Sequence, residues 1–377
     1  MTISVHTGVN PRDFPAPPPI LKRSRLMRPE PRLLRLSVLD QAIAVSGRPQ
    51  GESIRNAVAL AQHCERLGYA RFWVSEHHNH PTIVGTAPEV LLAAIAVKTE
   101  RIRIGSAGIM LPHYSPLKVA EQFRVLDALA PGRIDLGLGR APGSDGRTAF
   151  ALDPNANERP AHFVSEVRDL LSWVSGTPLV EGHPFAPVKA YPQGETVPEV
   201  WILGSSDYGA QVAAHFGLPF CFAYFFSDGA GAEAAVSIYK QNYRPSARHP
   251  NPHPALCVWA LAAPTDAEAE HHFTPRAKWR LFRERGIFPP IDTPEEAIAY
   301  PYTEVEKARM DKMRRDGFVG TPGQLGERLR ALAAAFDVGE LAIVTWTHDE
   351  NVRRQSYALI ADEFGLCSAV QTGLAAD

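Results

Sequence analysis

The chain has 377 residues, of which 45% are hydrophobic and 21% are charged, and its formal net charge is −2. This composition is typical of a globular protein and gives no basic excess of the kind that nucleic-acid binding requires. No apolar run approaches the roughly 20 residues of a membrane-spanning helix, so we expect no membrane segment. The four cysteines are scattered, which indicates buried thiols in a reducing cytoplasm rather than a disulfide scaffold or a zinc site.

The two ends of the chain are predicted to lie outside the folded domain. Residues 1–32 are rich in proline and arginine and lack an apolar period, so we expect a disordered N-terminal tail. Residues 367–377 are expected to form a C-terminal tail. A single domain over residues 33–366 is left between them.

That domain repeats one unit, a short apolar strand followed by an amphipathic helix. Strands are predicted over residues 34–39, 70–74, 101–107, 133–138, 200–203, 220–224, 256–261 and 341–344. Helices are predicted over residues 54–67, 88–98, 116–129, 158–174, 207–216, 231–244, 265–283, 321–336 and 349–364. Eight strands separated by helices predict an α/β fold of the (β/α)8 TIM-barrel type with insertions, whereas a doubly wound sheet would more often have five to seven strands.

Two segments fit no regular unit of this repeat. Residues 177–197 are rich in proline and glycine and are predicted to be an inserted hairpin or loop. Residues 284–318 are predicted to be a long excursion with short helices of its own, which in a compact domain is usually a lid or a binding loop. Phe288, Tyr300 and Tyr302 are its candidate substrate contacts, and an ordinary surface loop is the alternative.

Reactive or small residues stand at the carboxyl ends of four of the predicted strands. They occur at residues 75–80, 105–108, 137–140 and 204–208. In a closed parallel barrel the carboxyl ends of all strands open onto one face, and TIM-barrel enzymes have their active sites there. The sequence therefore predicts that the four clusters meet at one site.

Arg140 is a candidate phosphate ligand at the end of the fourth strand. Gly137 and Gly139 are expected to leave room for a ligand to approach the backbone, and a planar guanidinium can bind phosphate bidentately. A structural salt bridge is the alternative for this arginine.

The segment after the fifth strand is a second candidate phosphate site. Ser205, Ser206 and Tyr208 lie where a helix is predicted to begin, and the free N–H groups and dipole of a helix N-terminus favour an anion. Plain helix capping by Ser206 or Asp207 is the alternative. Asp207 is expected to cap the helix or to face solvent, because its charge would repel a phosphate.

The histidine cluster after the second strand suggests acid–base chemistry rather than a metal centre. No second group of ligands stands at a metal-binding spacing, so no metal is expected. His77 is the candidate general acid or base, since imidazole titrates near neutral pH. His78 is expected to be a packed supporting residue.

Ala107 and Gly108 form the least polar of the four clusters. Such small residues allow a flat ring to lie against the backbone, and they tolerate an unusual peptide geometry. A simple turn is the alternative.

Together the clusters resemble the bacterial luciferase-like, flavin-dependent monooxygenases. The resemblance runs from about Leu33 to Phe364 and is closest to the alkanal monooxygenase-like branch. Its specificity comes from the order of the blocks. These are Glu76, His77 and His78 after an aromatic strand, residues 105–112 (Gly-Ser-Ala-Gly-Ile-Met-Leu-Pro), residues 132–140 (Gly-Arg-Ile-Asp-Leu-Gly-Leu-Gly-Arg) and residues 319–322 (Val-Gly-Thr-Pro).

The resemblance implies a TIM-barrel enzyme that uses reduced FMN, or in other branches the deazaflavin F420. His77 matches the catalytic histidine beside the flavin, and Arg140 matches the phosphate-binding arginine. Ala107 and Gly108 match the site of a non-prolyl cis peptide under the flavin ring. A second phosphate loop is matched more loosely by Ser205, Ser206 and Tyr208. At the position of a luciferase cysteine this chain has Gly139, so light emission is not expected.

The implied reaction is the insertion of one oxygen atom from O2 into a small apolar organic substrate through a C4a-peroxyflavin. An aldehyde is one candidate substrate. A separate NAD(P)H:flavin reductase is expected to supply the reduced flavin, and relatives commonly form homodimers. Two alternatives stay open: an F420- or flavin-dependent reductase or dehydrogenase on the same barrel, and a flavin-binding protein without turnover.

Overall fold

The structure is a computed structural model, and it describes residues 34–141, 143–155 and 158–366. The two predicted tails, residues 1–32 and 367–377, lie outside the described residues. Among the described helices, none is long and apolar enough to cross a membrane. Cys64, Cys221 and Cys257 are buried free thiols, and Cys367 is outside the described part of the chain.

Eight parallel strands close into a barrel, so the predicted (β/α)8 class is confirmed. Each strand pairs with the next in chain order from β1 to β7, and β9 pairs with both β7 and β1. The barrel strands are β1 (Arg35–Asp40), β2 (Arg71–Val74), β3 (Arg103–Met110), β4 (Ile134–Gly139), β5 (Glu199–Gly204), β6 (Phe220–Phe222), β7 (Pro254–Ala262) and β9 (Glu340–Val344).

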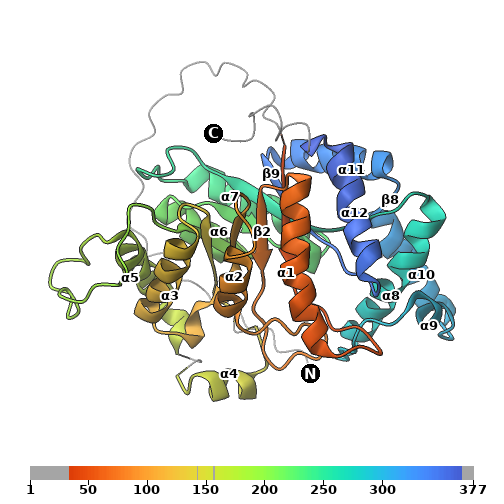
Figure 1. Ribbon diagram of the computed structural model, residues 1–377, viewed down its shortest axis with the longest axis horizontal. Coiled ribbons are helices and arrows are strands. Elements are labelled where there is room, and N and C mark those ends of the chain that lie inside the picture. Colours follow the sequence, from red (N-terminus) through yellow and green to blue (C-terminus); the bar gives the residue numbers. More distant parts are fainter. Residues whose placement is uncertain (1–33, 142, 156–157, 367–377) are drawn as a thin grey trace. The chain divides into compact units, whose positions relative to one another are not determined.

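A ring of amphipathic helices covers the outside of the barrel, and in Figure 1 α2, α1 and α12 lie side by side in front of the strands. Helix α1 buries Ala57, Leu60, Ala61 and Cys64, whose helical spacing places them on one face, and it ends at Gly68 in the left-handed conformation. The ring consists of α1 (Gln50–Leu67), α2 (Pro88–Ala96), α3 (Pro116–Leu129), α5 (Phe163–Ser175), α6 (Asp207–Phe216), α7 (Ala232–Asn242), α11 (Pro322–Phe336) and α12 (Glu350–Glu363).

Two details differ from the prediction for the central part of the chain. A short helix, α4 (Gly146–Leu152), follows β4, and the Asp145 side chain caps it by accepting hydrogen bonds from the N–H groups of Arg147 and Thr148. Residues 177–197 contain no strand, so the hairpin alternative is wrong and the loop alternative holds for this segment.

The floor of the barrel is a buried network of charges. Arg71, at the start of β2, contacts three carboxylates that begin other strands, at 2.8 Å from Asp135, 2.7 Å from Glu199 and 3.0 Å from Glu340. Above it the indoles of Trp73 and Trp201 fill the middle of the barrel, with ring centroids 5.0 Å apart. The interior is therefore closed at the amino ends of the strands, and a ligand can enter only from their carboxyl ends.

A larger insertion than expected joins β7 to the next helix of the ring. Helix α8 (Asp266–Glu284) was expected to belong to that ring, but its residues Phe273 and Ala277 pack into the apolar cluster inside the barrel. Helix α11 takes the outer position instead, since its Leu325 and Leu329 belong to the outer core. The insertion continues through α9 (Pro294–Ile298), α10 (Glu304–Asp316) and β8 (Phe318–Gly320), which pairs with the end of β7. Figure 1 shows α8, α9 and α10 grouped beyond α12.

Candidate active site

His77 is placed at the mouth of the barrel by β2. Strand β2 ends at Val74, and His77 follows it in the loop at the carboxyl end of the barrel. The backbone N–H of His77 donates to the carbonyl of Gly85 at 3.0 Å. Its Nδ1 atom is buried and has no hydrogen-bond partner among the described residues.

Burial is the main reason that the pKa of His77 falls to about 4, and the charges of His80 and His78 act in the same direction. The imidazole is therefore neutral at pH 7. A neutral imidazole has one nitrogen that accepts and one that donates, so His77 can hold or pass a proton at the mouth.

Glu76 supports the histidine loop and was missed as a functional candidate. Its fully buried carboxylate accepts hydrogen bonds from His78 Nε2 at 2.7 Å, from the Met110 N–H at 3.0 Å and from the Tyr114 hydroxyl at 2.6 Å. The end of β2 is thereby fastened to the end of β3. His78 is packed in this network, as the sequence indicated.

Ala107 and Gly108 lie within β3 rather than in a turn, and the peptide bond between them is cis, as the resemblance implied. The pairing of β3 with β4 shifts register between Ser106 and Ile109. A Cβ atom on Gly108 would lie 2.7 Å from the Gly137 carbonyl oxygen and 2.9 Å from Leu203 Cδ1. Gly108 is therefore required by close contacts between strands.

The same contacts change the interpretation of Gly137, which was expected to leave room for a ligand. A Cβ atom at this position would lie 2.1 Å from the Ser106 carbonyl oxygen and 2.6 Å from Leu203 Cδ1. Gly139 is less crowded, since its added Cβ would lie 3.3 Å from the flexible Met110 sulfur. Gly137 thus serves the packing of β3, β4 and β5.

Arg140 and Tyr208 lie together at the ends of β4 and β5. The guanidinium carbon of Arg140 is 4.0 Å from the centroid of the Tyr208 ring, which is a cation–π geometry. Among the described residues, no carboxylate forms an ion pair with Arg140. The salt-bridge alternative therefore finds no support in the described part of the chain.

Ser205 and Ser206 are exposed at the N-terminus of α6, next to this stacked pair. Ser206 is the N-cap residue, yet its side chain makes no capping hydrogen bond. The capping alternative for Ser206 is therefore wrong. Asp207 is exposed in the first turn, as expected. Hydroxyls and first-turn N–H groups are left available for an anion.

The loops that carry His77 and Arg140 contact each other, so one rim holds both. The N–H of His78 lies 3.3 Å from the carbonyl oxygen of Gly143, and Asn79 Nδ2 lies 3.1 Å from a carboxylate oxygen of Asp145. Strands β2, β3, β4 and β5 are consecutive neighbours in the barrel. The four predicted clusters thus meet at its carboxyl end.

Aromatic rings lie beside the histidine loop at the rim. The His80 ring lies 5.9 Å from the His77 ring and 4.9 Å from the Phe288 ring, as centroid distances. Trp279 of α8 lies 4.7 Å from Trp346 by the same measure, and its Nε1 donates to Thr82 at 2.8 Å. Phe288 therefore lies at the mouth. Tyr300 and Tyr302 instead contact each other edge to face, with ring centroids 4.9 Å apart.

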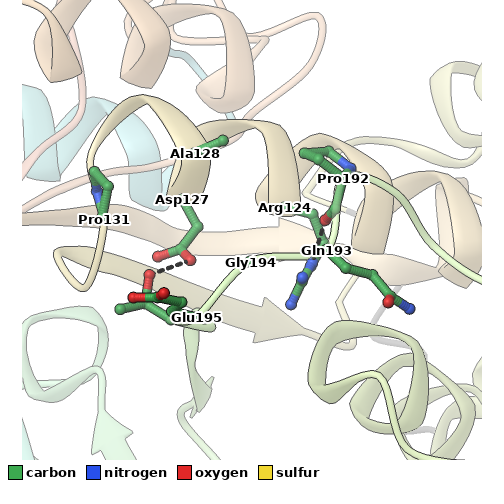
Figure 2. Close-up of a pocket in the computed structure, with 9 residues that line it drawn as sticks. Arg124, Asp127, Ala128, Pro131, Pro192, Gln193, Gly194 and Glu195 are labelled. Atoms are coloured by element: carbon green, nitrogen blue, oxygen red, sulfur yellow. Dashed lines mark hydrogen bonds between the residues drawn. The ribbon is translucent and has the colours of Figure 1, made fainter.

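The pocket drawn in Figure 2 lies elsewhere and does not belong to this rim. Arg124 and Asp127 of α3 line it together with the segment that precedes β5. Their polar groups are already used, because Arg124 donates to the Pro192 carbonyl at 2.6 Å and Asp127 accepts from the Thr196 hydroxyl at 2.7 Å. Pro131 and Thr196 precede β4 and β5, so the pocket lies toward the amino ends of these strands.

A model of the luciferase-like monooxygenase family matches residues 35–338. The chain belongs to this family, and the barrel with its rim is the family's fold. It is accordingly an oxidoreductase of the monooxygenase type, as the resemblance implied. Within the described residues, no group of three or more histidine, cysteine or acidic side chains could hold a metal ion.

Three comparisons show how far the similarity extends. An N-acetyl-S-alkylcysteine monooxygenase of Bacillus subtilis is 35% identical over 333 residues, which cover 88% of this chain and 98% of the relative. The crystal structure of apo-MsnO8 is 33% identical with a TM-score of 0.80, covering 89% of this chain and 98% of that one. The oxygenating constituent of 3,6-diketocamphane monooxygenase of Pseudomonas putida, in complex with FMN, shares the fold at 19% identity and a TM-score of 0.65, covering 88% of this chain and 97% of that one.

Proposed function

We propose that this protein is a monooxygenase that uses reduced FMN and O2 to transfer one oxygen atom to a small organic substrate. The observation that carries the proposal is the joint position of His77 and Arg140 on one rim, linked by contacts between their loops. A proton-handling group and a phosphate-binding group on the same rim are what a phosphorylated flat ring requires.

Contacts within this structure support the proposal that the residues of the rim bind FMN. Arg140 is held by the Tyr208 ring and is not engaged by a carboxylate in the described part of the chain. The side chain of Ser206 does not cap α6, and Ser205 is exposed beside it. We therefore assign the phosphate to Arg140, Ser205, Ser206 and the first turn of α6, with Tyr208 holding the guanidinium in place.

The ring end of the cofactor would lie against Ala107 and Gly108, next to His77. Reduced FMN, when bound, supplies the two electrons with which O2 is split into the transferred oxygen atom and water. His77 is neutral and keeps an unpaired buried Nδ1 atom, so its part is to hold or return a proton at that atom. Glu76 and His78 position the loop that carries it.

The aromatic side of the rim supplies the dry surroundings that oxygen transfer needs. Trp279, Trp346 and Phe288 cover the mouth, and apolar walls restrict the access of water to reacting groups. Residues 284–318 together with α8 are the proposed lid. The N-acetyl-S-alkylcysteine relative makes a thioether a candidate substrate beside the aldehyde.

Two partners belong to the proposal as well. A separate NAD(P)H:flavin reductase would deliver reduced FMN, and a homodimer is the expected assembly. F420 stays the alternative cofactor, because it can supply the same barrel with a hydride for a reductase or dehydrogenase reaction.

The test begins with anaerobic titration of the protein with reduced FMN and with reduced F420, followed by admission of O2. The proposal predicts that reduced FMN binds and that hydrogen peroxide appears more slowly than from free reduced FMN at the same concentration. Preferential binding of reduced F420, or peroxide release as fast as from free FMN, would contradict it.

A further inference from the structure

Arg276 is a buried arginine that the proposed flavin site does not use. It lies in the middle of α8, and only 7% of its surface is exposed. Its guanidinium carbon is 4.1 Å from the centroid of the Trp259 ring. Within the described residues it forms no ion pair, and its Nε atom is buried without an acceptor. A buried charge of this kind is normally paired, because desolvation is costly.

Trp259 provides a second unused donor at the same place. Its Nε1 atom is also buried and has no acceptor among the described residues. Arginine and indole N–H groups can only donate hydrogen bonds. Two neighbouring donors without acceptors are satisfied best by a group that accepts more than one hydrogen bond, and an ionised carboxylate is such a group and also neutralises the guanidinium charge.

No neighbouring carboxylate among the described residues is left to neutralise the positive charge of Arg276. Arg280, one turn further along α8, is paired with Asp228 through two contacts of 2.6 and 2.8 Å. Arg283 lies over the Phe226 ring, with its guanidinium carbon 5.7 Å from the centroid. The carboxylate of Asp228 is the one near these arginines, and it already forms an ion pair with Arg280. One buried guanidinium remains, which matches one monoanionic group.

Arg276 lies on the mouth side of the barrel, close to the histidine loop. Trp259 is in the apolar cluster inside the barrel, against which Ala107 also packs. Trp279 is three residues after Arg276 on α8, and residues with this spacing are neighbours on a helix. The Trp279 ring lies 6.5 Å from that of His80, which in turn lies 5.9 Å from that of His77, as centroid distances.

We propose that Arg276 and the indole N–H of Trp259 bind a carboxylate of the organic substrate, and this rests on the function proposed above. The flavin phosphate is assigned to the ends of β4 and β5, whereas Arg276 and Trp259 belong to α8 and β7. The substrate is therefore a molecule with an apolar part for the aromatic mouth and one anionic end for Arg276. This changes the expected substrate from a small apolar molecule to one that also carries an anionic group.

The test compares two probes of equal size, octanoate and octanamide, by calorimetric titration of the protein loaded with FMN. Octanoate is expected to bind at least about tenfold more tightly, since hydrogen bonds to charged groups are the stronger ones. In Arg276→Met the preference is expected to disappear, and in Trp259→Phe it should fall by about threefold. Arg283→Met removes the same charge from a more exposed position of α8 and should keep most of the preference.

Two further measurements distinguish a failure of this inference from a failure of the proposed function. Arg276→Met should bind FMN as the unchanged protein does and should melt at the same or a higher temperature, because an unpaired buried charge has been replaced by an apolar side chain. Equal binding of both probes to the unchanged protein, an undiminished preference in Arg276→Met, or loss of FMN binding in that variant would overturn the inference. Failure of the unchanged protein to bind FMN would instead contradict the proposed function, and the probe comparison can still be made without the flavin.

Discussion

The guanidinium of Arg140 lies over the ring of Tyr208, with 4.0 Å between the Cζ atom and the ring centroid. Arg140 follows β4 and Tyr208 lies in the first turn of α6, so the contact joins two of the segments that the sequence marks as phosphate sites. An arginine stacked on a ring keeps its N–H groups free at its edge. The Tyr208 ring therefore orients the N–H groups of Arg140, which can donate hydrogen bonds to an anion beside the N-terminus of α6.

The Tyr208 ring should matter more than its hydroxyl. Tyr208→Phe keeps the stacking surface and is expected to change the Kd for FMN by less than about threefold, whereas Tyr208→Ala should raise it by roughly fivefold to thirtyfold. Fluorescence titration with FMN measures both values. An equal loss in the two variants would show that the hydroxyl carries the effect.

His77 should make stability depend on pH. Its pKa is about 4 in the folded protein and near 6.5 in an unfolded chain, so between these values the unfolded state binds more protons. Stability contributed by the neutral ring is complete above pH 6.5 and is lost as the pH falls toward 4. From pH 7 to pH 5 the expected loss is up to about 2 kcal/mol.

His77→Gln replaces the ring by a side chain that does not titrate, so the variant should lose less stability over this interval. Urea unfolding of both proteins at pH 7 and pH 5 gives the comparison. Parallel losses in the two proteins would mean that His77 does not bind its proton differently in the folded and unfolded states.

The same substitution should separate binding from chemistry. His77→Gln is expected to bind FMN within about threefold of the unchanged protein and to lower turnover by about a hundredfold or more, as for removal of a general acid or base. His63→Gln, on the outer helix α1, is the control and should leave both quantities unchanged. Full turnover in His77→Gln would remove the role assigned to this residue.

Gly137 should not tolerate a side chain. Gly137→Ala would bring a Cβ atom to 2.1 Å from the Ser106 carbonyl oxygen, and we expect a loss of about 3 kcal/mol or more in the free energy of unfolding. Gly204→Ala is the matched control, because nothing lies within 4 Å of the added atom. Thermal melts of both variants compare their stability, and Gly137→Ala is expected to melt at a clearly lower temperature than Gly204→Ala. Similar melting temperatures would show that the strands can move apart without cost.

The barrel strands could be predicted because each is a short apolar run between turn residues, and the rim followed from the rule that such strands share one carboxyl end. Strand β8 could not be predicted, since three residues carry no periodicity. Helix α8 has an ordinary amphipathic pattern, and the sequence does not tell whether its apolar face meets the outside of a barrel or its mouth.

Individual roles at the rim were harder to predict than its position. Glu76 stands directly before the histidines, and only its three hydrogen bonds identify it as their support. Gly137 has the sequence signature of a ligand-binding glycine, but the crowding that requires it comes from Ser106 and Leu203, which are remote in sequence. Arg276 reads as one of many charges on a polar helix, and its burial becomes visible only when α8 is placed over Trp259.

The assignment of the phosphate to Arg140 is tested most directly by titrating the protein and its Arg140→Ala variant with FMN and with riboflavin, which lacks the phosphate. We expect the variant to bind FMN at least about thirtyfold more weakly while its Kd for riboflavin changes by less than about threefold, because a charge-assisted contact to phosphate is lost. A loss of equal size for both ligands would contradict the assignment and, with it, the arrangement of the flavin along this rim.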